Sequence, residues 1–170
     1  MKTLLIVDGY NVIHGSEDLK RLSDIQLEEA REKLIEDLNG YSGFKGWETI
    51  LVFDAYQQES FDDREEIRGR VKVVFTKKNK TADTYIEKLV YSLPKAYTVF
   101  VVTSDYTLQR MVLASGGERV PTRELIEDMA LTLKKFRQEK RIPQKQQSTL
   151  KDFMDEETLE KFRAMRIEES

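Results

Sequence analysis

Cysteine is absent from this 170-residue chain, and histidine occurs only once. The lack of cysteine excludes thiolate catalysis, cysteine-based zinc sites and disulfide bonds, and it fits a reducing compartment such as the cytoplasm. The single histidine, His14, cannot form the two-histidine acid–base pair of a metal-free ribonuclease. Long apolar runs are also missing. The stretch before Asp8 is too short for a signal peptide or a membrane span, so we expect no membrane partner.

A large excess of charge of one sign is missing as well. The formal net charge is −3, although 35% of the residues are charged, so a nucleic-acid partner would have to be held by local basic patches. The chain contains no Gly-x-x-x-x-Gly-Lys phosphate loop and no Gly-x-Gly-x-x-Gly turn, so we expect no dinucleotide cofactor. With 39% hydrophobic residues, the length fits one domain with an appendage.

The segment around Asp8 organises the rest of the chain. Four apolar residues, 4–7, run directly into Asp8, and Gly9 follows. An unbroken apolar run of this kind indicates a strand buried on both faces of a parallel sheet. We expect Gly9 to supply the unusual φ of a sharp exit from this strand. Asp8 then lies where open α/β sheets bind ligands, although it could equally cap a helix or close a turn.

Strands and helices are predicted to alternate along the chain, which gives an α/β fold with a mostly parallel central sheet and helices on both faces. The charged stretch Ala55–Gly69 is expected to be an excursion that contains one short helix. Further strands are expected at Glu48–Phe53, Val71–Phe75, Thr98–Thr103 and Glu118–Val120, and helices at Ser23–Tyr41, Ala82–Leu93, Tyr106–Ala114 and from a cap at Thr122 to about Arg141. Residues 1–141 are interpreted as the main domain. Residues 142–170 are interpreted as an extension with a hinge at Pro143–Thr149 and a last amphipathic helix.

Three aspartates occupy corresponding places at the ends of predicted strands, and a fourth lies in the first turn of a helix. They are Asp8, Asp54 and Asp105 at the strand ends, and Asp83 in the helix. Each has a structural explanation, because aspartate caps helices and complements their dipoles. Crowded together, however, they would repel one another unless a cation joined them. Hard oxygen ligands of this type suit Mg²⁺ or Mn²⁺, and a phosphate would complete the ion's shell. The set therefore favours hydrolysis of a phosphodiester.

Polar neighbours extend this acidic set. Asn11, three residues after Asp8, could orient a carboxylate or a water, or it could brace the loop. Thr103 and Ser104 precede Asp105 and carry hydroxyl groups suited to supporting hydrogen bonds.

Basic and aromatic residues near the acids could hold single-stranded RNA. Lys77, Lys78 and Lys80 directly precede the helix that carries Asp83, so we expect them to border the site. A second patch comprises Arg64, Arg68, Arg70 and Lys72. A third comprises Lys134, Lys135, Arg137, Lys140 and Arg141, and it could equally be a solvated helix face. Candidate stacking residues are Tyr10, Tyr56, Phe61 and Tyr106, of which we expect Tyr106 to pack in the core instead.

The ordered motifs Val7-Asp8-Gly9-Tyr10-Asn11, Phe53-Asp54-Ala55, Thr81-Ala82-Asp83 and Thr103-Ser104-Asp105-Tyr106 resemble those of the YacP-type NYN-domain nucleases, relatives of the PIN-domain nucleases. The resemblance covers about the first four-fifths of the chain. It implies a three-layer PIN-like fold and a divalent-metal-dependent endoribonuclease. It also implies that Asp8, Asp83 and Asp105 form the acidic core, with Asn11 and Asp54 nearby. Bacterial members of this type cut mRNA on translating ribosomes, so the resemblance implies mRNA as substrate and the ribosome as a partner.

Other readings of strand-end acids fit less well. A phosphoacceptor receiver domain would carry an acidic pair where Asp8 is followed by Gly9, and a haloacid-dehalogenase-type phosphatase would need an acid at Tyr10. A noncatalytic RNA- or ribosome-binding adaptor on the same fold remains the alternative. The expected reaction is attack by water rather than by the 2′-hydroxyl, which leaves a 5′-phosphate and a 3′-hydroxyl.

Overall fold

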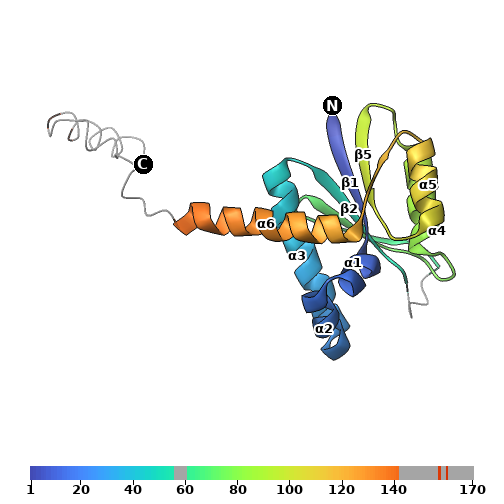
Figure 1. Ribbon diagram of the computed structural model, residues 1–170, viewed down its shortest axis with the longest axis horizontal. Coiled ribbons are helices and arrows are strands. Elements are labelled where there is room, and N and C mark those ends of the chain that lie inside the picture. Colours follow the sequence, from blue (N-terminus) through green and yellow to red (C-terminus); the bar gives the residue numbers. More distant parts are fainter. Residues whose placement is uncertain (56–60, 142–156, 158–159, 161–170) are drawn as a thin grey trace. The chain divides into compact units, whose positions relative to one another are not determined.

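The computed structural model describes residues 1–55, 61–141, 157 and 160 (Figure 1). Within these residues the chain forms six strands and six helices. In chain order they are β1 (Lys2–Asp8), α1 (Gly9–Gly15), α2 (Glu17–Ile25), α3 (Leu27–Lys45), β2 (Glu48–Phe53), β3 (Arg64–Arg68), β4 (Val71–Phe75), α4 (Ala82–Ser92), β5 (Tyr97–Val102), α5 (Tyr106–Ala114), β6 (Glu118–Val120) and α6 (Thr122–Arg141).

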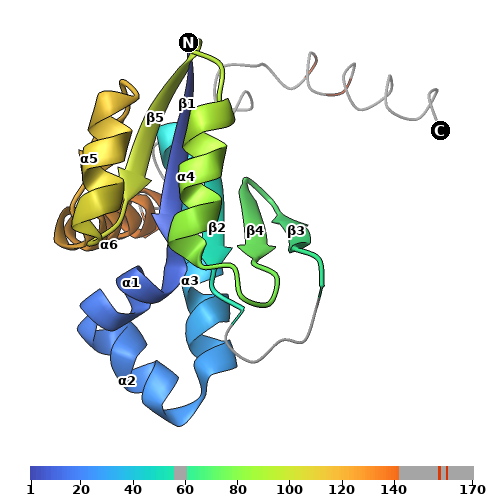
Figure 2. The same cartoon turned by 90° about the vertical axis from the view of Figure 1, so that its right-hand side faces the viewer.

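The strands form one sheet in the order β3-β4-β2-β1-β5-β6. Every pairing is parallel except that of β3 with β4. Figure 2 shows the arrowheads of β1, β2, β4 and β5 pointing to the same end, which is the carboxyl end of the sheet. Strand β1 lies in the centre, between β2 and β5. The predicted α/β fold with a mostly parallel sheet is confirmed.

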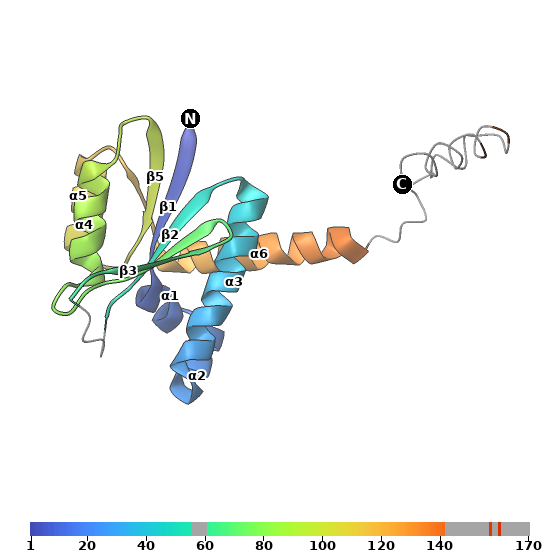
Figure 3. The same cartoon turned by 180° about the vertical axis from the view of Figure 1, so that it is seen from behind.

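Helices cover both faces of the sheet and make a three-layer structure, as Figure 3 shows from behind. On one face, Leu5 and Val7 of β1 pack in a core with α1, α2, α3 and α6. On the other face, Leu4 and Ile6 pack with α4 and α5. These four side chains are at most 4% exposed. Each contributes about 2 kcal/mol of hydrophobic stabilisation, which explains why β1 is apolar on both faces.

The first helical region differs from the prediction. The single helix expected at Ser23–Tyr41 is two helices, α2 and α3, which meet at the extended residue Gln26. Helix α1 was not predicted at all, because it is only seven residues long. Helix α3 ends at Gly46, which has a φ of +70°.

The excursion expected at Ala55–Gly69 contains strand β3 instead of a short helix in its described part. Every residue of β3 except Arg68 is exposed, because β3 is an edge strand that pairs on one side only. Its sequence, Arg-Glu-Glu-Ile-Arg, therefore lacks the apolar alternation that reveals a strand. Gly69, with φ of +64°, makes the tight turn into β4.

The other predicted elements are present. Strands β2, β4 and β6 and helix α5 have the predicted bounds, while β5 begins and ends one residue earlier than predicted. Thr81 caps α4 as expected, because its hydroxyl accepts a hydrogen bond from the backbone of Thr84 at 3.1 Å.

Two compact units divide the chain, Met1–Phe136 and Arg137–Ser170. The predicted hinge at Pro143–Thr149 and the apolar residues of the predicted last helix lie outside the described residues. Among the helices that are described, none has the length and apolar character needed to cross a membrane.

Candidate active site

Three of the predicted acids lie at the carboxyl end of three adjacent strands. Asp8 ends β1, Asp54 follows β2, and Asp105 follows β5 by three residues. Because β1 pairs with both β2 and β5, these aspartates come from neighbouring strands at the centre of the sheet. The chain leaves β1 towards β2 on one side and reaches β5 on the other, so this is the switch point at which open α/β sheets bind ligands.

Gly9 makes the close packing at this point possible, but not in the predicted way. Its φ is not positive, and it is the first residue of α1. Instead, a Cβ atom at position 9 would overlap the ring of Phe53 on β2. Glycine is therefore required here because the Phe53 ring fills the space.

A chain of hydrogen bonds holds Asp8. The side-chain amide of Asn11 donates to Asp8 Oδ2 at 3.4 Å, and Ser104 Oγ donates to Asn11 Oδ1 at 2.7 Å. Burial raises the pKa of Asp8, the hydrogen bonds from Asn11 oppose this increase, and the charges of Asp54 and Asp105 add to it. Asn11 thus both orients a carboxylate and ties α1 to the segment after β5, so the two roles considered for it coexist.

Asp83 comes from the start of a helix, whereas the other three acids lie at or after the ends of strands. It is the second residue of α4, two residues after the cap at Thr81. Its Oδ1 atom is buried and has no hydrogen-bond partner. Burial, together with the charges of Asp8, Asp105 and Asp54, raises its pKa to about 6. A carboxylate kept partly out of water beside three others is costly unless a cation compensates it.

Asp105 has two interactions at once. Its Oδ1 atom accepts a hydrogen bond from the backbone of Leu108 at 2.8 Å, so it caps α5. Its charge also acts on Asp8 and on Asp83. The backbone of Asp105 in turn donates to the Thr103 hydroxyl at 3.1 Å. The cap uses one carboxylate oxygen and leaves the other available.

Thr76 is a supporting residue that the sequence reasoning missed. Its buried hydroxyl accepts a hydrogen bond from the backbone of Ala55 at 3.1 Å and donates to the carbonyl of Lys80 at 2.6 Å. It also lies 3.4 Å from Asp54 Oδ1. Thr76 therefore ties the segment after β2 to the segment before α4. A threonine after an apolar strand gives no sequence signal of this role.

A pocket of about 350 Å³ opens among these residues. Its lining includes three of the four aspartates, and Asp105 lies outside it; the lining residues are Asp8, Tyr10, Asn11, His14, Asp54, Thr81, Ala82 and Asp83. Segments far apart in the sequence thus bring three carboxylates to one opening. We call this the acidic pocket. His14, in α1, is exposed and also lines the acidic pocket.

The donor chemistry of the acidic pocket fits a hard divalent cation. Its carboxylate oxygens are the ligands that Mg²⁺ and Mn²⁺ prefer, and the unpartnered Asp83 Oδ1 is an available one. In the part of the chain that the structure describes, no three His, Asp or Glu side chains form a ready-made chelating cluster. Mg²⁺ needs only one or two carboxylates when waters and phosphate complete its shell, so the residues present fit such an ion.

The three predicted lysines differ in how far their charges are free to bind a phosphate. Lys77 and Lys78 are exposed, but the Lys80 ammonium forms an ion pair with Asp63 at 2.9 Å and is largely covered. The backbone of Lys77 also donates to Asp63 at 2.8 Å. Although burial raises the pKa of Asp63, the hydrogen bonds and charges of these two lysines outweigh it, so the net pKa is lowered. These lysines directly precede α4, but none of them lines the acidic pocket, and the charge of Lys80 is already neutralised.

The predicted aromatic residues also differ in whether they lie at the acidic pocket. Tyr10 lines the acidic pocket and accepts hydrogen bonds from Arg31 at its hydroxyl. The expectation that Tyr106 packs in the core is wrong, because it is 71% exposed on the first turn of α5. Phe61 is 89% exposed, and Tyr56 lies outside the described residues.

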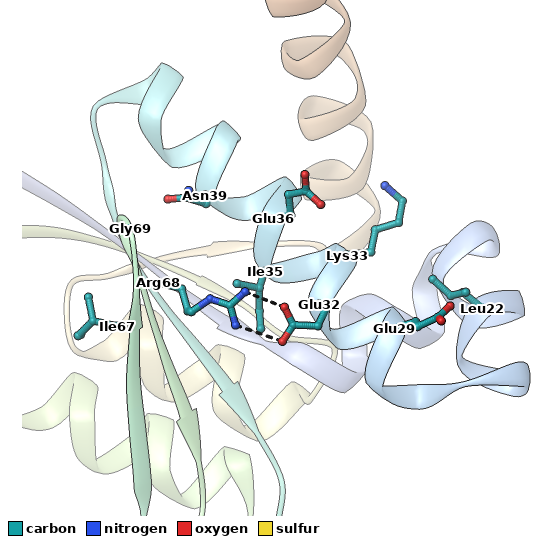
Figure 4. Close-up of a pocket in the computed structure, with 10 residues that line it drawn as sticks. All are labelled: Leu22, Glu29, Glu32, Lys33, Ile35, Glu36, Asn39, Ile67, Arg68 and Gly69. Carbon is teal, nitrogen blue, oxygen red and sulfur yellow. Dashed lines mark hydrogen bonds and ion pairs between the residues drawn. The ribbon is translucent and has the colours of Figure 1, made fainter.

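A second groove, of about 680 Å³, runs between α3 and β3 and is a weaker candidate for the site. Figure 4 shows Arg68 joined to Glu32 by two hydrogen bonds, which measure 2.7 and 3.1 Å. These bonds lower the pKa of Glu32 and neutralise its charge. The other acids of the groove, Glu29 and Glu36, are exposed, whereas the acidic pocket holds a buried carboxylate oxygen without a partner, Asp83 Oδ1.

Comparisons with known proteins agree with the sequence resemblance. The sequence model of the YacP-like NYN domain matches residues 5–167. The uncharacterized protein YacP of Bacillus subtilis (strain 168) is 35% identical over 164 residues, which are 96% of each chain. A crystal structure of Rae1 (YacP) from Bacillus subtilis is 35% identical with a TM-score of 0.72, covering 96% of this chain and 94% of that one. A mutant of that protein gives the same identity and TM-score over 87% of each chain.

Proposed function

Because this chain belongs to the YacP-like NYN domain family, which implies an RNA-related nuclease, we propose that it is a divalent-metal-dependent endoribonuclease. The observation that carries this proposal is the acidic pocket, where Asp8, Asp54 and Asp83 line one opening and Asp83 Oδ1 is buried without a partner. The substrate is single-stranded RNA, and water attacks the phosphodiester to leave a 5′-phosphate and a 3′-hydroxyl.

The four aspartates have the central role. Asp8, Asp54, Asp83 and Asp105 would hold Mg²⁺ or Mn²⁺, directly or through water. A divalent cation at such a site lowers the pKa of water and neutralises charge on the phosphate. Asn11 is a positioning residue, because it fixes the Asp8 carboxylate and is itself fixed by Ser104.

Substrate binding is assigned to residues around the acidic pocket. Tyr10 lines it and offers a ring on which an unpaired base can stack. Lys77 and Lys78 offer exposed charge to phosphates, and Lys80 supports the same loop through Asp63.

The cellular context follows from the family resemblance. We assign mRNA on translating ribosomes as the substrate, with the ribosome as partner and the cytoplasm as the compartment. Residues 1–141 form the nuclease domain in this proposal, and residues 142–170 form a C-terminal extension.

The proposal is tested by cleavage of single-stranded RNA with and without divalent cations, alone and on translating ribosomes. We expect cleavage that EDTA abolishes, that Mg²⁺ or Mn²⁺ restores, and that Asp8→Asn removes. Asp24→Asn, an exposed acid on α2, is the matched control and should cut like the wild type. Products with a 2′,3′-cyclic phosphate would refute the mechanism. RNA or ribosome binding without cleavage under all of these conditions would favour the noncatalytic adaptor.

A further inference from the structure

Three aromatic rings form a row at the carboxyl end of the sheet. The ring centroids of Tyr10 and Phe53 are 5.1 Å apart, and those of Phe53 and Phe75 are 5.5 Å apart. Phe53 ends β2 and Phe75 ends β4, and the two residues pair in register. Tyr10 lines the acidic pocket, so this aromatic row leads from the pocket across β2 and β4 towards the edge strand β3.

Two arginines lie on the aromatic row. The Arg31 guanidinium is 5.7 to 5.9 Å from all three ring centroids. It donates to the Tyr10 hydroxyl at 2.6 and 3.0 Å and forms an ion pair with Glu28 at 2.8 Å. Because its side chain is only 17% exposed and its donors are largely occupied, Arg31 fixes Tyr10 rather than binding a ligand.

Arg64 is placed differently. Its guanidinium carbon lies 4.4 Å from the Phe75 centroid, and the residue is exposed at the start of β3. Within residues 61–141 and 1–55 it forms no ion pair with a carboxylate. A guanidinium stacked on a ring keeps its N–H groups at its edge, where they bind a phosphate with two parallel hydrogen bonds.

The other cations of the predicted second patch do not share this placement. Arg68 forms ion pairs with Glu32 and Glu66, and Lys72 forms one with Glu65. Arg70 lies in the turn at the opposite end of the β3–β4 hairpin, beside the amino end of β4. Only Arg64 among these four is both next to the aromatic row and without an acidic partner in the described chain.

RNA approaching the acidic pocket meets repulsion from its carboxylates, so cations beside the pocket must hold the phosphates. Phe53 and Phe75 are themselves buried, so the row is not a surface for RNA, and Arg64 is the exposed group at its β3 end. We propose that Arg64, stacked on Phe75, binds a backbone phosphate of single-stranded RNA at this edge of the sheet. This assignment rests on the proposed function and names a contact that it does not include.

Binding of a fluorescently labelled single-stranded RNA oligonucleotide to the full chain in EDTA, measured by anisotropy over a range of salt concentrations, tests the assignment. We expect Arg64→Gln to lower the affinity about tenfold and to reduce the slope of log K against log salt by about 0.7. Arg70→Gln is the matched control: it removes the same charge from the other end of the same hairpin and should leave affinity and slope unchanged. Arg64→Lys keeps the charge, so it should keep the slope and lose affinity.

The outcomes separate this assignment from the proposed function. Equal losses in Arg64→Gln and Arg70→Gln, or no loss in either, would overturn the assignment, and so would a wild-type chain that binds no RNA. Cleavage in Mg²⁺ is measured on the same samples. A chain that binds RNA through Arg64 but never cuts it would refute the nuclease and leave the Arg64 contact standing. If Arg64→Gln fails to fold, Arg64→Lys decides, because wild-type affinity in that variant would contradict a stacked, two-bond contact.

Discussion

Replacing Asp83 by asparagine should stabilise the metal-free protein while it removes activity. In the folded chain the pKa of Asp83 is about 6, against 3.8 for an unperturbed aspartate. The folded state therefore binds this proton more tightly than the unfolded state does. The carboxyl group costs no stability below the unfolded pKa, and its cost grows as the pH rises towards and through about 6. At neutral pH the ionised group thus destabilises the fold, and a neutral amide of the same shape removes that cost.

The size of the effect follows from the shift in pKa. A difference of about two pKa units corresponds to about 3 kcal/mol for a fully buried group. Asp83 is only half-buried, and solvent screening reduces this figure to about 1.5 kcal/mol. Asparagine also loses the favourable interaction of a charge with the start of α4, which is about 0.5 kcal/mol. The net gain of Asp83→Asn is about 1 kcal/mol at neutral pH, or about 2 to 4 °C in Tm.

Thermal unfolding in EDTA over a range of pH measures this gain. Asp18→Asn is the matched control, because Asp18 is also the second residue of its helix, α2, but is exposed. It should lose about 0.5 kcal/mol through the helix dipole and gain nothing. The advantage of Asp83→Asn should shrink as the pH falls below about 6, and Mg²⁺ should raise the Tm of the wild type more than that of the variant. A variant less stable than the wild type at neutral pH would show that Asp83 is structural and that our reasoning is wrong.

Three further changes test the scaffold of the site. Gly9→Ala should cost about 2 kcal/mol in urea unfolding, because its methyl group overlaps Phe53, and Phe53→Leu should restore part of this loss; an unaffected Gly9→Ala would disprove the close packing. Thr76→Val should cost about 2 kcal/mol, because it leaves a partly buried N–H and a partly buried carbonyl without their partner. If it costs no more than the same change at an exposed threonine, the described hydrogen bonds do not stabilise the fold. The pKa of Asp63 lies below its usual value, so its pair with Lys80 stabilises the fold above the unfolded pKa and is lost as the pH falls through the folded one. Asp63→Asn should therefore cost about 0.5 kcal/mol at neutral pH and nothing in strong acid, and a cost independent of pH would refute the ion pair.

The parts of the fold that the sequence predicts are those where burial determines the residue type. Strands β1, β2 and β4 are apolar because helices cover both faces of the sheet, and each could be located from that pattern. Strand β3 could not be located, because an edge strand with exposed side chains needs no apolar residues. Helix α1 was missed because seven residues give too few turns for a helical period to appear.

Some features of the candidate site could likewise be predicted from the sequence, and others could not. The apolar runs predict parallel strands, and this places Asp8, Asp54 and Asp105 at one edge of the sheet. That β2, β1 and β5 are adjacent required the structure. The unpartnered oxygen of Asp83 and the tie made by Thr76 depend on how separate segments pack, and no local pattern records them. Gly9 is instructive, because the residue was singled out correctly while the reason, space for Phe53 rather than a positive φ, needed the structure.

The edge strand β3 affects whether the protein aggregates at high concentration. An edge strand presents backbone groups that can pair with a strand of another molecule, and such pairing leads to aggregates. Here four of the five side chains of β3 are charged and of both signs, Arg64, Glu65, Glu66 and Arg68. A strand of a second copy that paired with β3 would have to remove water from these charges, and the pairing would not place each charge opposite one of the other sign. The same polar character that hides β3 from sequence patterns therefore discourages the molecule from extending its sheet into a neighbour.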